Sequence, residues 1–306
     1  MIRADPWYNN YMNKIYDTAI VGGGIAGFSA ALTAKSLKLD YVWFGEKAFG
    51  KKTASAEYVR NYPSFTGGGA EFSAALEKQK AAEEIVLTER RIDGVYKAAE
   101  GFFLTSGEEN YTARTVILAT GVELGAGVKG EREFLGKGVS YCAVCDGALY
   151  RGKRIAALLS SDDAEEAEYL ASFAEEVLLF SAKPVQVKAK NIRTVAERVV
   201  AVEGEKRVER VVTGAGAYPV SGVFFLGKAL PPDVLFAGLK TEGASVVVGR
   251  GGETSVKGVF AAGDVTGKPY QFAKAAGEGC VAAYSVKDYL KSGKKMNNRC
   301  NFCPNA

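Results

Sequence analysis

Residues 16–27 read Tyr-Asp-Thr-Ala-Ile-Val-Gly-Gly-Gly-Ile-Ala-Gly, an apolar run followed by closely spaced glycines. The apolar spacing of the next dozen residues predicts a helix, and residues 41–44 predict a second strand. This order of strand, glycine turn, helix and strand is typical of a dinucleotide-binding unit. In such a unit Gly22 makes the tight turn, Gly24 lets a pyrophosphate approach the backbone, and Gly27 lets helix and strand pack closely.

The first turn of the predicted helix includes Ile25 and Ala26, and its backbone N–H groups carry a partial positive charge that suits phosphates. Read alone, the glycine motif is also compatible with a turn that binds nothing. An acidic residue at the end of the second strand ordinarily binds a ribose hydroxyl of the dinucleotide. Glu46 is in position for that contact, and Gly45 just before it leaves the register of the strand end open.

A second strand and helix pattern of the same kind lies in the middle of the chain, over residues 153–180. Residues 258–290 then predict a strand, an acidic turn, a loop and a long helix. Alternating strands and helices predict an α/β protein with parallel sheets. We therefore expect two Rossmann-like domains, one inserted in the other.

The composition excludes several chemistries. The 306 residues include 39 basic and 35 acidic side chains, five cysteines and no histidine. Without histidine, a Ser-His-Asp or Cys-His nucleophile, a histidine-bound metal and a histidine pH switch are impossible. The net charge of +4 is too weak and too dispersed to indicate nucleic-acid binding, which usually requires a concentrated basic patch.

The chain also lacks the patterns of membrane insertion and secretion. No apolar run approaches the roughly 18 residues that span a membrane. The N-terminal residues lack the apolar core of a secretion signal, so we expect a cytoplasmic protein. Stable disulfides are rare in the cytoplasm, so the cysteines are expected to be reactive, metal-binding or buried.

The most specific chemical motif is Cys142-Ala-Val-Cys145, followed by Asp146 and Gly147. Two thiols separated by two residues can close a small disulfide ring and reopen it. Asp146 is adjacent to the second thiol and could protonate a leaving thiolate, a task that histidine cannot perform here.

The other cysteines leave alternatives open. Cys300 and Cys303 form a second pair near the chain end, and the two pairs together could supply four zinc ligands. That reading is disfavoured, because compact zinc modules keep their pairs closer in sequence. The terminal pair is otherwise an extra redox relay, a regulatory disulfide, a metal clip or a tail without a catalytic role. Cys280 is expected to be a small buried residue of the last helix.

Five stretches together resemble the low-molecular-weight thioredoxin reductases, in both order and spacing. They are GGGIAG at 22–27, NYPSF at 61–65, ATG at 119–121, CAVCDG at 142–147 and GVFAAGDV at 258–265. The resemblance covers nearly the whole chain, from Tyr16 to Leu290.

The resemblance implies a domain organisation and an assembly. Residues 1–121 and 249–306 would form a three-layer ββα domain that binds FAD, with 1–11 and 297–306 as extensions. Residues 122–248 would form a central domain that carries the dithiol and is related to the pyridine-nucleotide domains. The family resemblance also implies a homodimer.

The resemblance further assigns roles to single residues. Cys145 would lie beside the flavin ring, Cys142 would attack the disulfide of thioredoxin, and Asp146 matches the acid/base of the family. Asp264 matches the carboxylate that binds the ribityl chain. The residues placed at the cofactor are Gly22, Gly24, Ile25, Ala26, Gly27, Glu46, Lys52, Asn61, Thr120, Gly121, Gly263, Asp264, Tyr270, Gln271 and Phe272.

The central domain departs from the family where NADPH would bind. The family has a second glycine fingerprint there, whereas residues 158–164 read Leu-Leu-Ser-Ser-Asp-Asp-Ala and contain no glycine. Side chains would block a pyrophosphate, and the two aspartates would repel it. The family also grips the 2′-phosphate with a His-Arg-Arg cluster, where this chain has Ser181-Ala-Lys-Pro184. One lysine cannot reproduce the bidentate geometry of arginine.

The flavin side departs as well. Tyr270-Gln271 stands where the family has Arg-Gln, and Lys51-Lys52 stands in the usual Gly-Gly-Gln loop. Tyr270 and Phe272 could pack against the flavin ring; the alternative is that both are core aromatics.

This pattern resembles the ferredoxin-dependent flavin thioredoxin reductases of anaerobes and the deeply rooted reductases of some cyanobacteria. It implies an FAD-dependent disulfide reductase that reduces thioredoxin with electrons from ferredoxin. The alternatives are a donor such as NAD(P)H bound by an atypical site, and a flavin redox sensor with little turnover. Ferredoxins are acidic, and the lysines that could contact one are Lys51, Lys52, Lys291, Lys294 and Lys295.

Overall fold

The computed structural model divides the chain into two compact units, one of residues up to 122 together with residues from 230 onward, the other of residues 123–229. Sequence patterns place the second junction near residue 249, whereas residues 230–248 pack with the first unit, where Phe236 contacts Phe102 with ring centroids 5.8 Å apart. The structure describes residues 14–54, 56–122, 127–141, 143–160, 164–226 and 230–300, without the side chains of 51, 52, 145 and 293–300.

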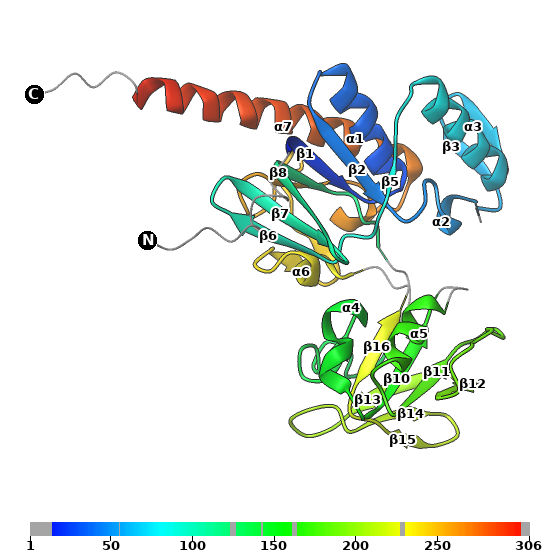
Figure 1. Ribbon diagram of the computed structural model, residues 1–306. Helices are drawn as coiled ribbons and strands as arrows, with labels where there is room; N and C mark the ends of the chain where they lie inside the picture. The colour runs from blue at the N-terminus through cyan, green and yellow to red at the C-terminus, as the bar shows by residue number, and fades with distance from the viewer. Residues whose placement is uncertain are drawn as a thin grey trace, which may run out of the picture. The chain divides into compact units, whose positions relative to one another are not determined.

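The first unit is built on a sheet in the order β5-β2-β1-β8-β7-β6 (Figure 1). β19 also pairs with β8. The parallel strands of this sheet are β1 (Ile15–Val21), β2 (Tyr41–Gly45), β5 (Thr88–Glu89), β8 (Glu109–Leu118) and β19 (Val259–Ala261). β6 (Gly94–Ala98) and β7 (Gly101–Ser106) continue the sheet from β8 as an antiparallel meander. A parallel sheet extended by a meander is the Rossmann-like arrangement that the glycine motif predicts.

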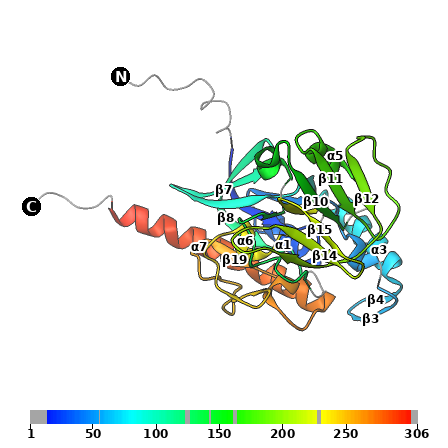
Figure 2. The same ribbon diagram turned by 90° about the horizontal axis from the view of Figure 1, so that it is seen from below.

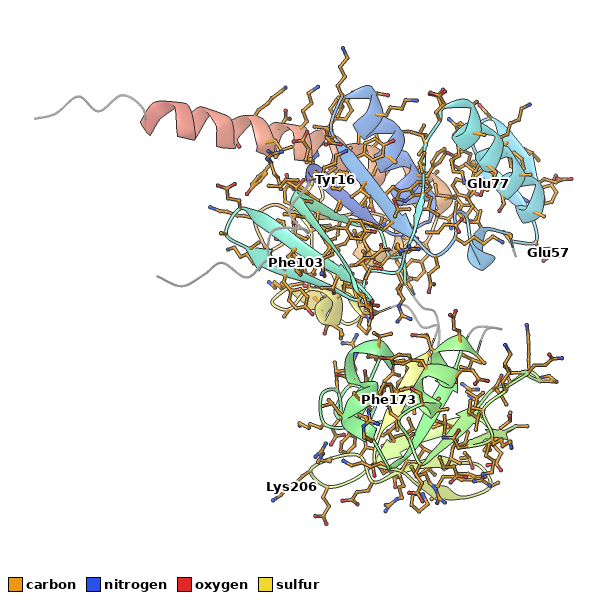
Figure 3. The ribbon with its side chains drawn as sticks, viewed as in Figure 1. Tyr16, Glu57, Glu77, Phe103, Phe173 and Lys206 are labelled. Atoms are coloured by element: carbon orange, nitrogen blue, oxygen red, sulfur yellow. The ribbon has the colours of Figure 1, made fainter. Side chains whose placement is uncertain are left out.

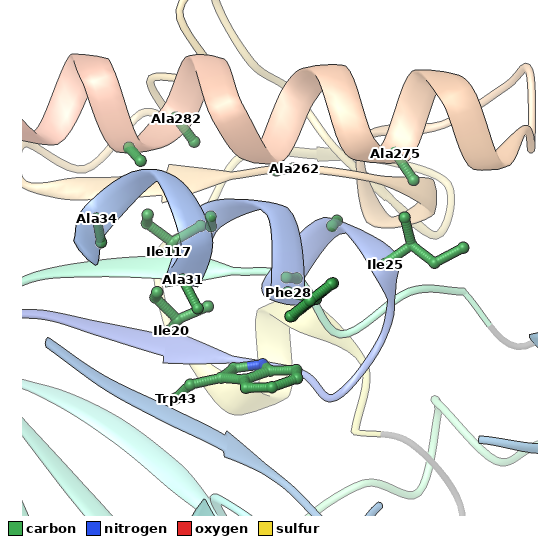
Figure 4. Packing of buried hydrophobic residues seen from close by; sticks show 14 of the residues in the cluster. Ile20, Ile25, Phe28, Ala31, Ala34, Trp43, Ile117, Ala262, Ala275 and Ala282 are labelled. Atoms are coloured by element: carbon green, nitrogen blue, oxygen red, sulfur yellow. The ribbon is translucent and has the colours of Figure 1, made fainter. Parts of the chain in front are cut away.

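Two helices, α1 (Ile25–Ser36) and α7 (Phe272–Cys300), lie side by side in this unit (Figure 1). Small residues let them approach: a Cβ on Gly279 would lie 2.1 Å from the carbonyl oxygen of Ala26. Figure 4 shows Ala275 and Ala282 of α7 pointing toward α1. The α1–α7 pair therefore forms a close-packed layer against the sheet.

The remaining elements of the first unit are short. β3 and β4 pair with each other and lie beside α3 (Figure 2). The bounds are α2 (Lys51–Ala54), β3 (Val59–Tyr62), β4 (Phe65–Gly67), α3 (Gly69–Ala82), α6 (Pro232–Leu235), β17 (Thr241–Glu242), β18 (Ser245–Val246) and η2 (Asp264–Thr266).

The second unit has its own parallel sheet in the order β12-β11-β10-β16-β9. Its strands are β9 (Val139–Ser140), β10 (Arg154–Leu159), β11 (Glu176–Phe180), β12 (Ile192–Val195) and β16 (Val223–Leu226). An antiparallel sheet of β13 (Val199–Glu203), β14 (Arg210–Thr213) and β15 (Ala217–Pro219) accompanies it, with α4 (Ala143–Asp146), η1 (Gly147–Tyr150) and α5 (Glu165–Ala171). The predicted α/β class with two Rossmann-like units is confirmed. No helix in the described part of the chain is long and apolar enough to cross a membrane.

Candidate functional site

The glycine turn after β1 has a backbone that only glycine tolerates at two positions. Gly22 has φ +130°, and a Cβ there would lie 2.1 Å from the carbonyl oxygen of Ala119. A Cβ on Gly27 would lie 2.0 Å from the carbonyl oxygen of Gly22. Both glycines therefore allow backbone to contact backbone, as the motif predicts.

A tryptophan that sequence reasoning missed supports this turn. Trp43 of β2 is fully buried, and its Nε1–H donates a hydrogen bond of 2.8 Å to the carbonyl oxygen of Gly22. Its ring also packs against Phe28 of α1, with centroids 5.8 Å apart (Figure 4). The available signal was an indole in the strand beside the glycine turn, which needs a hydrogen-bond acceptor when buried.

Gly24 differs from its neighbours. It has φ −81° and is the N-cap of α1, with no side-chain hydrogen bond at that cap. A Cβ on Gly24 would meet nothing within 4 Å, so open space lies in front of the turn. The first turn of α1 contains no acidic residue. An open helix N-terminus without nearby carboxylates on its own first turn suits a pyrophosphate.

The end of β2 explains the glycine before Glu46. A Cβ on Gly45 would lie 2.7 Å from the Cα of Gly23, so the strand end packs directly on the glycine turn. β2 ends at Gly45, and Glu46 follows it with an exposed side chain. The register that the sequence left open thus places Glu46 beside the turn, where a ribose hydroxyl could reach it.

The second flavin motif, residues 258–265, ends in a turn that reaches the same region. Gly263 has φ +87°, and a Cβ there would lie 2.7 Å from the Cβ of Ala26 in α1. Asp264 follows as the first residue of η2. The turn with Asp264 therefore lies against the beginning of the helix that Gly24 caps.

Two predicted flavin residues meet although 210 positions separate them. Asn61 of β3 donates through Nδ2 to Oε1 of Gln271, at 2.6 Å. Thr120 and Gly121 follow β8, and a Cβ on Gly121 would meet open space. Phe272 packs its ring against Phe72, with centroids 5.3 Å apart, as the core alternative for that residue expects.

Together these residues fit FAD. The glycine turn leaves open space at a helix N-terminus, and the carboxylates of Glu46 and Asp264 are the acceptors that ribose and ribityl hydroxyls require. Tyr270 is half-buried just before α7. The side chain of Lys52 lies outside the description.

The second unit carries the dithiol motif. Cys142 lies outside the described residues, and Cys145 belongs to α4 with its side chain not described. Ala143 between them is buried in a core that includes Leu170 and Phe224. A Cβ on Gly147 would lie 3.0 Å from Cδ2 of Leu170, so the motif is seated closely on α5.

Asp146 is half-buried at the end of α4. Its charge acts on Tyr150: burial chiefly raises the pKa of that phenol, and the negative charge of Asp146 raises it further. Within the motif, Val144 is 44% exposed. Phe173, labelled in Figure 3, has the Arg151 guanidinium over its ring at 5.1 Å.

The part of the second unit that would bind a nucleotide has an unsuitable charge. α5 has 7 residues, and Glu165, Glu166 and Glu168 lie in its first turn. The Glu168 carboxylate accepts hydrogen bonds from the backbone N–H groups of Lys188 and Ala189, so it fastens the loop between β11 and β12 to α5.

The loop after β11 closes on itself. Ser181 Oγ donates to the carbonyl oxygen of Lys183 at 2.8 Å, and the Lys183 N–H returns a bond to Ser181 Oγ. Asn191 at the other end of the loop donates to the carbonyl oxygens of Ala171 and Ala174. Both ends of the loop are therefore held by contacts within this unit.

The other cysteines lie apart from α4 in the sequence. Cys280 is a half-buried residue of α7 without a disulfide. Cys300 is the last residue of α7, with its side chain outside the description, and Cys303 is among the residues not described. The roles predicted for the terminal pair stay predictions.

Comparison with known proteins agrees with this geometry. Residues 16–279 match the pyridine nucleotide-disulphide oxidoreductase family. A thioredoxin reductase of Bacillus subtilis is 32% identical, over 91% of this chain and 96% of that protein. A crystal structure of a ferredoxin-flavin thioredoxin reductase from Clostridium acetobutylicum is 36% identical, covers 90% of this chain and 98% of that one, and has a TM-score of 0.85.

Overall identity alone does not fix the reaction. A glucosaminate ammonia-lyase of Pseudomonas fluorescens is 35% identical over 89% of this chain and 94% of that protein. The different reactions named for these relatives do not affect the family assignment. That assignment is supported by the family match, the two Rossmann-like units and the fit of the glycine turn to a dinucleotide. The chain belongs to the pyridine nucleotide-disulphide oxidoreductases, and among them to the FAD-binding low-molecular-weight thioredoxin reductases.

Proposed function

We propose that this protein is an FAD-dependent disulfide reductase that reduces thioredoxin through Cys142 and Cys145, with electrons from reduced ferredoxin rather than NADPH. The observation that carries the proposal is the combination of an intact CAVCDG motif with acidic residues at the start of α5. The motif supplies the disulfide chemistry, and the acidic helix start opposes a nucleotide phosphate.

The spacing of the pair allows a disulfide to close and reopen, and the family resemblance assigns the role of each thiol. The Cys142 thiolate attacks one sulfur of the thioredoxin disulfide, which breaks the S–S bond and forms a mixed disulfide. Cys145 then attacks Cys142, which releases thioredoxin as a dithiol and leaves a Cys142–Cys145 disulfide. Asp146 donates a proton to the leaving thiolate. Two electrons and two protons are consumed per thioredoxin.

Bound FAD would supply the link between a one-electron donor and this two-electron disulfide chemistry. On the protein side, Gly24 and the start of α1 would hold the pyrophosphate, and Glu46 and Asp264 would hold hydroxyl groups. Lys52, Asn61, Thr120, Gly121, Gly263, Tyr270 and Gln271 complete the proposed cofactor residues, whereas the packing of Phe272 against Phe72 makes it a core residue.

The second unit is poorly suited to binding NADPH. A nucleotide needs an unobstructed helix N-terminus and cationic side chains for its phosphates. α5 instead begins with Glu165 and Glu166, and the loop that could carry an arginine cluster is fastened to α5 through Glu168. The 36% identity with a protein named as a ferredoxin-flavin thioredoxin reductase supports ferredoxin as the donor.

An anaerobic experiment tests the donor. The purified flavoprotein is mixed with reduced ferredoxin, with NADPH, or with dithionite as a control for reducible flavin, and the flavin absorbance is followed. We expect bleaching with ferredoxin and dithionite, and none with NADPH. Rapid bleaching by NADPH would refute the proposed donor and favour an atypical nucleotide site. Absence of bleaching with ferredoxin would favour another carrier or a sensor.

A second experiment tests the dithiol. Cys145→Ser is expected to abolish thioredoxin reduction, while Cys280→Ser, which changes the half-buried cysteine of α7, is expected to retain it. The control matters because both substitutions remove one thiol. Thioredoxin reduction by Cys145→Ser would refute the assignment of the site.

Assembly and location complete the proposal. We expect the protein to be a homodimer, which sedimentation of the holoprotein would measure. We also expect it to be located in the cytoplasm. Lys51, Lys52 and the 63%-exposed Lys291 are proposed contacts for an acidic donor, so electron transfer from ferredoxin should slow as salt rises.

A further inference from the structure

Lys274 and Glu278, on the first turns of α7, surround the turn that carries Asp264. The Lys274 ammonium lies 3.0 Å from the carbonyl oxygen of Gly263 and 2.8 Å from that of Gly267. It also donates to Thr266 Oγ1 at 2.8 Å and pairs with Glu278 at 3.1 Å. The ammonium thus binds the turn at its beginning, middle and end.

Glu278, on the same helix, also binds this turn, so that the two side chains together enclose it. Its Oε2 accepts from the backbone N–H of Gly263 at 2.8 Å and from Thr266 Oγ1 at 2.9 Å. Both polar groups of the Gly263 backbone are therefore held by charged partners, which form stronger hydrogen bonds than neutral ones. The Lys274 side chain is only 18% exposed, so water competes little for these contacts.

The pair is poorly placed for the stability of α7 itself. Lys274 lies in the first turn of the helix, where the helix dipole disfavours a positive charge. Lysine four residues before glutamate is also the less favourable order for an ion pair along a helix. Helix stability therefore does not explain the positions of Lys274 and Glu278, whereas their contacts with the turn do.

The enclosure orients the peptide before Asp264. Because the carbonyl group and the next N–H of a trans peptide point in opposite directions, a Gly263 carbonyl held by Lys274 directs the Asp264 N–H away from it. A Cβ on Gly263 would meet Ala26 of α1, so the turn is confined between the two helices.

We propose that Lys274 and Glu278 are positioning residues for FAD: they hold the Gly263–Gly267 turn so that Asp264 meets the cofactor. The inference rests on the proposed flavin site and is independent of the electron donor. Neither residue is placed at the cofactor by the sequence motifs.

The test is FAD affinity of the full-length protein, measured by flavin fluorescence during release on dilution and during titration of the flavin-free chain. Lys274→Met is expected to raise the Kd about tenfold to a hundredfold, or about 1.4 to 2.8 kcal/mol at about 1.4 kcal/mol per tenfold. Lys287→Met is the matched control, because Lys287 of the same helix also donates to a backbone carbonyl oxygen, that of Leu37. Its Kd should stay unchanged.

Two outcomes decide the matter. A Kd for Lys274→Met within twofold of the parent protein, or an equal rise in Lys287→Met, would overturn the proposal. If Lys274→Met fails to fold, Glu278→Gln, which keeps the shape and removes the charge, carries the test: weaker FAD binding supports the role, and unchanged binding refutes it. Neither measurement involves ferredoxin or thioredoxin, so the result is independent of the proposed reaction.

Discussion

Replacing Gly24 with alanine should separate cofactor binding from folding. Gly24 has φ −81°, which alanine adopts freely, and its Cβ would project into open space. Removing glycine flexibility from the unfolded chain stabilises a protein by about 0.4–1 kcal/mol. Alanine is a poorer N-cap than glycine by a similar amount. The flavin-free protein should therefore change its free energy of unfolding by less than about 1 kcal/mol.

FAD binding should respond differently. The open space in front of Gly24 is where we place the pyrophosphate, so the added methyl group would intrude on the cofactor. Overpacking by one such group costs about 1–3 kcal/mol, which corresponds to a Kd about fivefold to 150-fold higher. Thermal unfolding of the flavin-free chain and titration with FAD measure the two quantities separately.

Two further glycines serve as controls. Gly277 is an exposed residue of α7 with open space around it, so Gly277→Ala should stabilise the protein by about 1 kcal/mol and leave the FAD affinity unchanged. Gly22→Ala should destabilise the flavin-free chain itself, because its Cβ would lie 2.1 Å from a backbone oxygen at φ +130°. An unchanged FAD affinity in Gly24→Ala, or a loss of stability like that of Gly22→Ala, would refute the reasoning.

Other substitutions test other contacts. Trp43→Phe removes the hydrogen bond from the indole to the half-buried carbonyl oxygen of Gly22 and reduces the volume of a fully buried ring, so urea unfolding should show a loss of about 2–4 kcal/mol. A loss below about 0.5 kcal/mol would contradict this. The hydrogen bond from Arg90 is the main cause that lowers the pKa of Glu109 to about 2. The ionised Glu109 therefore stabilises the folded state at pH values above its unfolded pKa. This stabilisation is lost as the pH falls toward 2. Arg90→Met should raise the pKa of Glu109 toward 4.5, as read from the carboxyl carbon shift in an NMR titration, and an unmoved pKa would exclude Arg90 as its cause. Asp146→Asn should slow thioredoxin reduction about a hundredfold or more with an unchanged flavin spectrum, and a normal rate would exclude it as the acid.

The fold could be predicted because its signals are local. The strand, glycine turn and helix at 16–36 are encoded by consecutive residues, and Gly22 and Gly27 of that turn allow close backbone contacts that a Cβ would prevent. The same is true of the strand and helix that begin the second parallel sheet. The domain junction was harder to predict from the sequence. Residues 230–248 belong to the first unit, where Phe236 packs against Phe102, a residue far away in the sequence.

The candidate site could be predicted only where a motif carries it. The motifs and the family resemblance predict Gly24, Glu46 and Asp264 as cofactor contacts. Trp43 and Lys274 were missed, because a tryptophan in a strand and a lysine in a helix have no local mark of their hydrogen-bond partners.

The sequence alone determined the glycine turn, the dithiol pair and the absence of histidine, because each depends on residue identity or on neighbours in the chain. Only the tertiary structure decided that Asn61 meets Gln271 across 210 positions, and that Lys274 and Glu278 enclose the turn before Asp264. Such contacts depend on how α7 packs against α1 and the sheet, and packing is a property of the whole fold rather than of any segment.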